Sequence, residues 1–163
     1  MYYPVFSSEK IITMDWMTGI HLSEFTAINT DHEVGDKIGQ ALWDFYMYQI
    51  HVLRKVHADP HPGNFLVDDQ KQLIALDFGC MKQIPDDFYI PYFELINKDV
   101  ITDSALFNQK LFELEILRPD DSASEIEYFT EMFHDLLSLF TKPFQDETFD
   151  FSDETFFENI AKL

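Results

Sequence analysis

Side chains that could do chemistry crowd into one short stretch of the sequence. Residues 57–64, His-Ala-Asp-Pro-His-Pro-Gly-Asn, supply two imidazoles, a carboxylate and a carboxamide, and Leu-Asp-Phe-Gly follows at 76–79. Carboxylate and carboxamide oxygens are ligands for Mg²⁺, which completes its shell with water and substrate phosphates. We therefore predict that Asn64 and Asp77 bind magnesium. Asp59 can then orient or deprotonate an attacking hydroxyl or water.

A hairpin is the element that must position these groups. Two short β-prone runs, 64–67 and 73–76, flank a charged turn, which is the pattern of two antiparallel strands. Folding back at the turn brings Asn64 close to Asp77. Two prolines and a glycine exclude a helix over 57–64, so this stretch is predicted to be an irregular loop.

The order of these groups is informative as well as their types. An aspartate, an asparagine five residues later and an Asp-Phe-Gly whose aspartate lies thirteen residues further on follow the order of a kinase catalytic loop and metal motif. Two other readings stay open. His57, Asp59 and His61 could instead bind a transition metal in a hydrolase. The chain could also be a non-catalytic module that binds nucleotide or serves as a scaffold.

The combination of these two motifs closely resembles the UbiB/AarF-like atypical kinase family, in which Asp-Pro-His-Pro-Gly-Asn is a distinctive catalytic loop. Aminoglycoside and choline kinase-like phosphotransferases share the His-x-Asp-x-His-x-x-Asn frame but usually lack the proline after the aspartate. Pro60 therefore favours the first family, with a small-molecule phosphotransferase as the alternative. Residues 14–19, Met-Asp-Trp-Met-Thr-Gly, also resemble that family's strand and hinge, with aspartate where the family more often has glutamate.

This resemblance implies roles for named residues. Asp59 would be the catalytic aspartate, and Asn64 and Asp77 would hold Mg²⁺ against the phosphates of ATP. His61 would belong to the same cofactor site, either supporting Asp59 or contacting phosphate. His57 would be a structural histidine that braces the loop against the Asp-Phe-Gly turn.

The resemblance also implies where the adenine would lie. The backbone of Asp15, Trp16 and Met17 would face it, as the hinge does in a kinase. The phosphate acceptor would be a small molecule or lipid-related compound, in an ATPase or phosphotransferase linked to isoprenoid-quinone or lipid metabolism. A peptide acceptor is disfavoured because the sequence leads almost at once from Asp-Phe-Gly into a predicted helix at Asp86, which leaves no long docking segment.

The overall fold is predicted to be mainly α-helical with a small β-hairpin. The resemblance makes residues 1–163 one C-terminal lobe of a protein-kinase-like fold, with the N-terminal lobe absent and expected as the missing partner. Its expected parts are a strand and hinge at 10–19, a catalytic loop at 57–64, a hairpin and metal motif at 64–79 and a helical remainder at 86–163. Without the lysine of the other lobe, we expect the chain to be inactive alone.

Helical spacing of apolar residues locates the predicted helices. A short helix is expected at 21–28, and a longer one begins after an Asp31 N-cap and runs to about residue 56. Four more are expected in the second half of the chain, at 86–98, 103–117, 122–141 and 153–162.

Composition excludes several partners and locations. Eleven Lys and Arg against thirty Asp and Glu give a formal charge of -19, which repels nucleic acid and anionic lipid. One cysteine, Cys80, allows no disulfide framework, and no apolar run is long enough to predict a membrane span. We therefore expect a cytoplasmic chain whose full-length parent could still associate with a membrane.

Overall fold

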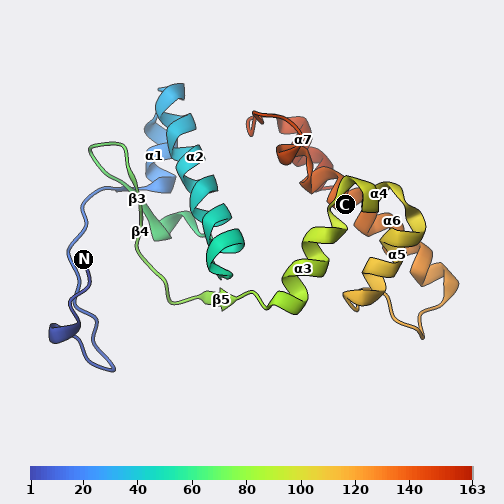
Figure 1. Cartoon of the computed structure of the whole chain (residues 1–163). Helices are drawn as coiled ribbons and strands as arrows, with labels where there is room; N and C mark the ends of the chain where they lie inside the picture. Colours follow the sequence, from blue (N-terminus) through green and yellow to red (C-terminus); the bar gives the residue numbers. More distant parts are fainter. Residues whose placement is uncertain (163) are drawn as a thin grey trace. The chain divides into compact units, whose positions relative to one another are not determined.

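The computed structural model describes residues 1–162 and contains two compact units, Met1–Ile84 and Pro85–Leu163 (Figure 1). Both are built mainly from helices, and the first adds small antiparallel sheets, in agreement with the predicted fold class. The division falls directly before the predicted helical remainder. Every residue with a predicted role in chemistry lies in the first unit, so the two units are described separately.

The first unit alternates short strands with two helices. In chain order its elements are η1 (Pro4–Phe6), β1 (Ile20–His21), α1 (Leu22–Ile28), α2 (His32–Tyr48), the π-helical turn η2 (Gln49–Leu53), β2 (Lys55–His57), η3 (Pro62–Asn64), β3 (Phe65–Val67), β4 (Leu73–Ala75) and β5 (Met81–Gln83). Helix α1 and the Asp31 cap of α2 are as predicted, since the Asp31 side chain accepts from the amides of Glu33 and Val34. The predicted end of the long helix, near residue 56, was wrong. The π-helical turn that follows α2 ends at Leu53, Arg54 adopts a left-handed conformation (φ 52°), and the chain then enters β2.

The predicted hairpin is confirmed and is larger than expected. Strands β3 and β4 pair antiparallel with Phe65 opposite Ala75, and β1 adds on the other side of β3 with Ile20 opposite Val67. A second small sheet pairs β2 with β5, placing His57 opposite Met81. The loop at 57–64 therefore begins at the end of β2. The Asp-Phe-Gly at 77–79 lies between the end of β4 and the start of β5.

The strand predicted at the start of 10–19 does not form a regular ladder. The β pairing in residues 2–14 consists of isolated bridges, Tyr2 with Met14 and Ser8 with Ile11. Ile11 and Ile12 are 61% and 69% exposed, so the β-prone side chains have no apolar surface to pack on. Strand propensity depends on such packing, which is why the sequence pattern alone misled here.

Apolar side chains from both helices and the hairpin form the core of this unit. The buried members are Leu22, Phe25, Ile38, Phe65 and Val67, and Phe45 and Tyr46 of α2 pack against them. Strand β3 is buried along its whole length, which fixes the hairpin that carries the site.

A buried histidine connects this core to the metal motif. His57 is 2% exposed; its amide donates to Gln49 Oε1 at 2.8 Å, and its Nε2 is hydrogen-bonded to the carbonyl oxygen of Asp77. A carbonyl only accepts, so Nε2 carries the proton, and Nδ1 is left buried without a partner in the described part of the chain. The structural role predicted for His57 is thus confirmed.

The second unit is entirely helical in the described residues. Its elements are α3 (Asp86–Leu95), α4 (Lys98–Thr102), α5 (Ser104–Glu113), α6 (Ala123–Phe140), η4 (Lys142–Phe144) and α7 (Glu154–Ile160). The four predicted helices are confirmed, but the first ends at Leu95 and a short unpredicted helix, α4, follows it. The second ends before Glu115, which has φ 58°. Ser122 and Glu125 form a reciprocal capping box that starts α6. Within residues 1–162, no helix has the length and apolarity needed to cross a bilayer.

Gly19 is expected to be intolerant of any side chain. A Cβ at this position would lie 2.7 Å from the Val67 carbonyl oxygen, a backbone atom of a buried strand that cannot move aside. We expect Gly19→Ala to lower the free energy of unfolding by about 1–3 kcal/mol in urea denaturation, the range for overpacking. Gly39→Ala is the matched control: nothing lies within 4 Å of its Cβ inside α2, so it should stabilise by about 0.5–1 kcal/mol. Equal effects at the two positions would contradict this packing.

Replacing the buried imidazole tests the link between the core and the metal motif. His57→Phe keeps an aromatic ring but removes the donor to the Asp77 carbonyl, so we expect a loss of about 1–3 kcal/mol in unfolding free energy. His32→Phe, at the exposed first residue of α2, is the control and should change stability by less than about 0.5 kcal/mol. An unchanged His57→Phe would show that the hydrogen bond does not stabilise the unit.

Candidate active site

The loop that carries Asp59 is anchored at both ends by backbone hydrogen bonds. Ala58 N donates to the Cys80 carbonyl at 2.8 Å, which continues the pairing of β2 with β5. At the other end, Leu76 N donates to the Asn64 carbonyl at 2.9 Å, extending the hairpin by one residue pair. Asn64 therefore lies opposite Leu76, and Leu76 is the residue that precedes Asp77. This is the arrangement that the hairpin predicts.

Asn64 bridges the loop to the hairpin through its side chain. Its Nδ2 donates to Asp59 Oδ2 at 2.9 Å and to the Asp59 carbonyl oxygen at 3.1 Å. Both hydrogen bonds use the amide nitrogen, so the amide oxygen Oδ1 remains available to another partner. The same contacts fix the Asp59 carboxylate on an exposed loop.

Asp77 presents the second oxygen group. One carboxylate oxygen, Oδ1, accepts from Gly79 N at 2.7 Å, and the Asp77 backbone carbonyl is bonded to His57. No described residue forms a hydrogen bond to Oδ2, and the side chain is exposed.

These two oxygens are of the kinds that bind magnesium. One amide oxygen, from Asn64, and one carboxylate oxygen, from Asp77, come from adjacent strand ends, and Mg²⁺ commonly takes few protein ligands beside water and phosphate. The structure joins Asn64 to Asp59 through side-chain hydrogen bonds and places Asp77 directly after Leu76, the backbone partner of Asn64. The role of Asn64 and Asp77 as magnesium ligands stays a prediction.

Tyr46 of α2 is a neighbour of the site that sequence reasoning missed. Its hydroxyl oxygen is buried and has no hydrogen-bond partner among residues 1–162. Burial, and next the negative charge of Asp59, raise the pKa of Tyr46 above its ordinary value. The tyrosine therefore stays protonated within the electrostatic field of the Asp59 carboxylate. In the sequence Tyr46 is only one member of an apolar helical stripe. The feature that could have identified it is a hydroxyl group at a core position, because a buried hydroxyl usually needs a hydrogen-bond partner.

His61 is held within its own loop. Its Nδ1 accepts from Gly63 N at 3.0 Å, and the ring is exposed. The contact shapes the turn at η3, and the predicted role of His61 in binding phosphate or supporting Asp59 stays a prediction.

The histidines do not converge as a transition-metal site requires. His57 is buried with its Nε2 bonded to the Asp77 carbonyl, and His61 uses Nδ1 in a turn. Within residues 1–162, no three His, Cys, Asp or Glu side chains are grouped so that they could hold a metal ion. The geometry therefore favours the oxygen pair over the metallohydrolase alternative.

The predicted hinge residues lie in the segment before β1. Asp15 binds the Met1 ammonium at 2.5 Å and the Tyr3 hydroxyl at 2.7 Å, and these two contacts lower its pKa. Trp16 is 88% exposed and Met17 is 42% exposed. No described contact joins these side chains to Asp59, Asn64 or Asp77. Their backbone role toward adenine stays a prediction, although Ile20 ties the following strand to the hairpin.

Comparison with known proteins gives a consistent result. Residues 2–111 match the family model of the ABC1 atypical kinase-like domain. The chain is 28% identical over 148 residues to Protein ACTIVITY OF BC1 COMPLEX KINASE 7, chloroplastic, of Arabidopsis thaliana, covering 91% of this chain and 21% of that protein. It is 23% identical over 159 residues to Atypical kinase COQ8B, mitochondrial, of Danio rerio, covering 96% of this chain and 24% of that protein.

The matched region contains the whole candidate site. It includes the loop at 57–64 and the Asp-Phe-Gly at 77–79, and the resemblance seen in these motifs is therefore confirmed. The chain spans between about a fifth and a quarter of the length of these relatives. Together the motifs, their juxtaposition in the structure and a family match over most of its length show that this chain belongs to the ABC1 atypical kinase-like family.

Proposed function

We propose that this chain carries the magnesium-binding and proton-accepting residues of an ATP-dependent phosphotransferase or ATPase. The observation that supports this most strongly is the orientation of the Asn64 amide. Its nitrogen donates two hydrogen bonds to Asp59, which leaves its oxygen free, and the Asn64 backbone carbonyl accepts from Leu76 N, the residue that precedes Asp77. One residue therefore positions the catalytic carboxylate and contributes to the cation site.

Each residue has a distinct task in this proposal. When bound, Mg²⁺ would neutralise charge on the nucleotide phosphates, with Asn64 and Asp77 as its protein ligands. The Asp59 carboxylate accepts the proton of the attacking hydroxyl or water, and the Asn64 Nδ2 donor holds that carboxylate in place. The hydrogen bond from His57 to the Asp77 carbonyl fixes the backbone from which the second ligand projects.

The proposed acceptor is a small molecule or lipid-related compound rather than a peptide. The segment after Asp-Phe-Gly is taken up by β5, which pairs with β2, and α3 begins at Asp86. Little chain remains between them to form a docking platform. A link to isoprenoid-quinone or lipid metabolism, implied by the resemblance, is part of this proposal. The relatives are designated chloroplastic or mitochondrial, so the predicted cytoplasmic location remains a prediction.

The proposed place of the chain in a whole enzyme is the C-terminal lobe of a protein-kinase-like fold. The hinge backbone at Asp15, Trp16 and Met17 would then face adenine, and a lobe that supplies a lysine to the phosphates would be the partner. On this view the chain alone binds nucleotide weakly and does not transfer phosphate.

Removing the charge of one proposed ligand tests the cation site. We expect isothermal calorimetry to show Mg²⁺-dependent binding of ADP, weakened about 10- to 100-fold or more in Asp77→Asn, since even an indirect metal-site partner is worth that much. Asp69→Asn, on the exposed turn of the same hairpin, makes the same charge change and should bind like the unaltered chain. Equal weakening by both variants would mean that the cation binds non-specifically to the acidic surface.

Substitution of Asp59 should affect the same titration differently from substitution of a cation ligand. In Asp59→Asn the new amide oxygen can still accept from Asn64 Nδ2, so the site geometry is retained. We expect Mg²⁺-dependent ADP affinity within about threefold of the unaltered chain, because no ligand charge is lost. A loss as large as that of Asp77→Asn would identify Asp59 as a metal ligand and overturn its role as proton acceptor.

A further inference from the structure

A pocket of about 520 Å³ lies between α2 and the β3–β4 hairpin, and Phe78 of the Asp-Phe-Gly motif closes one end of it. Its walls are mainly apolar, from Ala41, Phe45, Leu73, Ala75 and Phe78. This volume is within the usual range for small-molecule sites, roughly 300–1,000 Å³.

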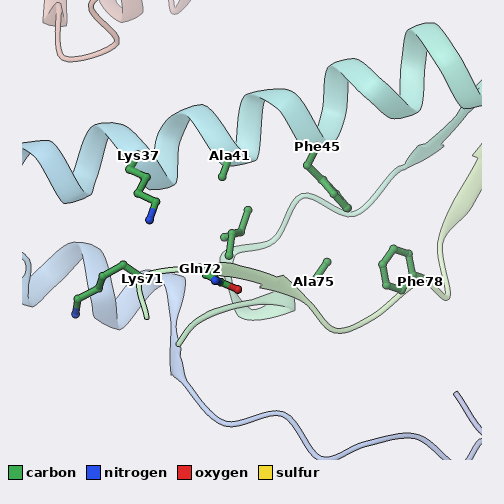
Figure 2. A pocket seen from close by; sticks show the side chains of 8 residues that line it. Lys37, Ala41, Phe45, Lys71, Gln72, Ala75 and Phe78 are labelled. Carbon is green, nitrogen blue, oxygen red and sulfur yellow. The ribbon is translucent and has the colours of Figure 1, made fainter. Parts of the chain in front are cut away.

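The two ends of the pocket differ in chemistry. Figure 2 shows Lys37 from α2 and Lys71 from the hairpin turn at one end, and Phe45 and Phe78 at the other. The site is therefore cationic at one end and aromatic at the other, and it contains no carboxylate among its lining residues.

The two lysines at the cationic end take no part in ion pairs with described residues. In the part of the chain that the structure describes, neither Lys37 nor Lys71 forms an ion pair. Asp68 and Asp69 line an adjoining pocket together with Lys71, and Asp68 Oδ1 accepts from the backbone amides of Gln70 and Gln72.

We propose that this pocket binds a small amphiphile with one anionic head group, its head between Lys37 and Lys71 and its apolar body along Ala41 and Leu73 toward Phe45 and Phe78. Charge complementarity fixes the head group, and the apolar walls fix the body. The inference rests on the pocket alone and does not depend on the proposed function.

Phe78 connects the pocket to the metal motif. It is 52% exposed, follows Asp77 directly, and its ring contacts those of Phe45 and His57 at centroid distances of 6.5 and 5.8 Å. A bound apolar body would bury more of this ring. We therefore expect ligand binding in the pocket to change the NMR shift of the Gly79 amide, which donates to Asp77 Oδ1.

The test uses three monomeric probes that share one alkyl chain: octyl phosphate, octyl glucoside and octyltrimethylammonium, each below its critical micelle concentration. We expect octyl phosphate to bind at least about tenfold more tightly than the other two, because only its head group pairs with both lysines. Backbone NMR shifts should move at Ala41, Ala75 and Phe78. Equal binding of the three probes, or shifts confined to the second unit, would overturn the proposal.

Variants separate the head-group site from the apolar walls. The double variant Lys37→Gln with Lys71→Gln should weaken octyl phosphate about tenfold or more while leaving octyl glucoside unchanged. Lys82→Gln with Lys98→Gln is the control, since it removes the same charge from exposed positions outside the pocket. Ala41→Leu fills the pocket and should weaken octyl phosphate without unfolding α2, as circular dichroism would show.

A membrane surface is the rival occupant, and the same variants distinguish it. Vesicles of anionic phospholipid should bind weakly, given the net charge, and should not displace octyl phosphate from the pocket. Binding that appears only with vesicles, or octyl phosphate affinity unchanged in the Lys37 and Lys71 double variant, would show that the pocket does not hold a monomeric amphiphile.

Discussion

The site depends on one buried hydrogen bond, from the His57 imidazole to the backbone carbonyl of Asp77. His57 is itself fixed by the side chain of Gln49, which donates in turn to the Phe45 carbonyl. Leaving any of these buried polar groups without a partner would be costly, so the helix, the loop and the metal motif are positioned together. The exposed carboxylates can then remain in place although few of their own contacts are buried.

Much of this arrangement follows from sequence pattern, because the signals are local. Prolines in the loop, the Asp31 cap and the charged turn each specify backbone conformation within a few residues, and the start of the long helix and the hairpin were predicted correctly. The position of Asn64 opposite Leu76, the residue before Asp77, followed from the hairpin itself. The motif order also led to the correct family, which the match over residues 2–111 confirms.

The remaining features depend on contacts that the sequence pattern does not reveal. The pairing of β2 with β5 joins residues far apart in the chain and ends the long helix earlier than its apolar stripe suggests. The strand expected near Ile11 lacks a surface to pack on, so its propensity is not realised. Folding also places Tyr46 near the charge of Asp59, and it places Lys37 and Lys71 beside the apolar walls of the pocket. Neither arrangement can be read from the sequence pattern.

The central claim is that Asn64 and Asp77 together hold one divalent cation beside a nucleotide. It is tested most directly by paramagnetic NMR with Mn²⁺ in place of Mg²⁺, in the presence of ADP, on the unaltered chain. We expect the Asn64 side-chain amide and the amides of Asp77 and Gly79 to broaden at the lowest Mn²⁺ concentrations, before those of Asp68 and Asp69. Broadening that begins at that turn, or throughout the acidic surface of residues 85–162, would contradict the account.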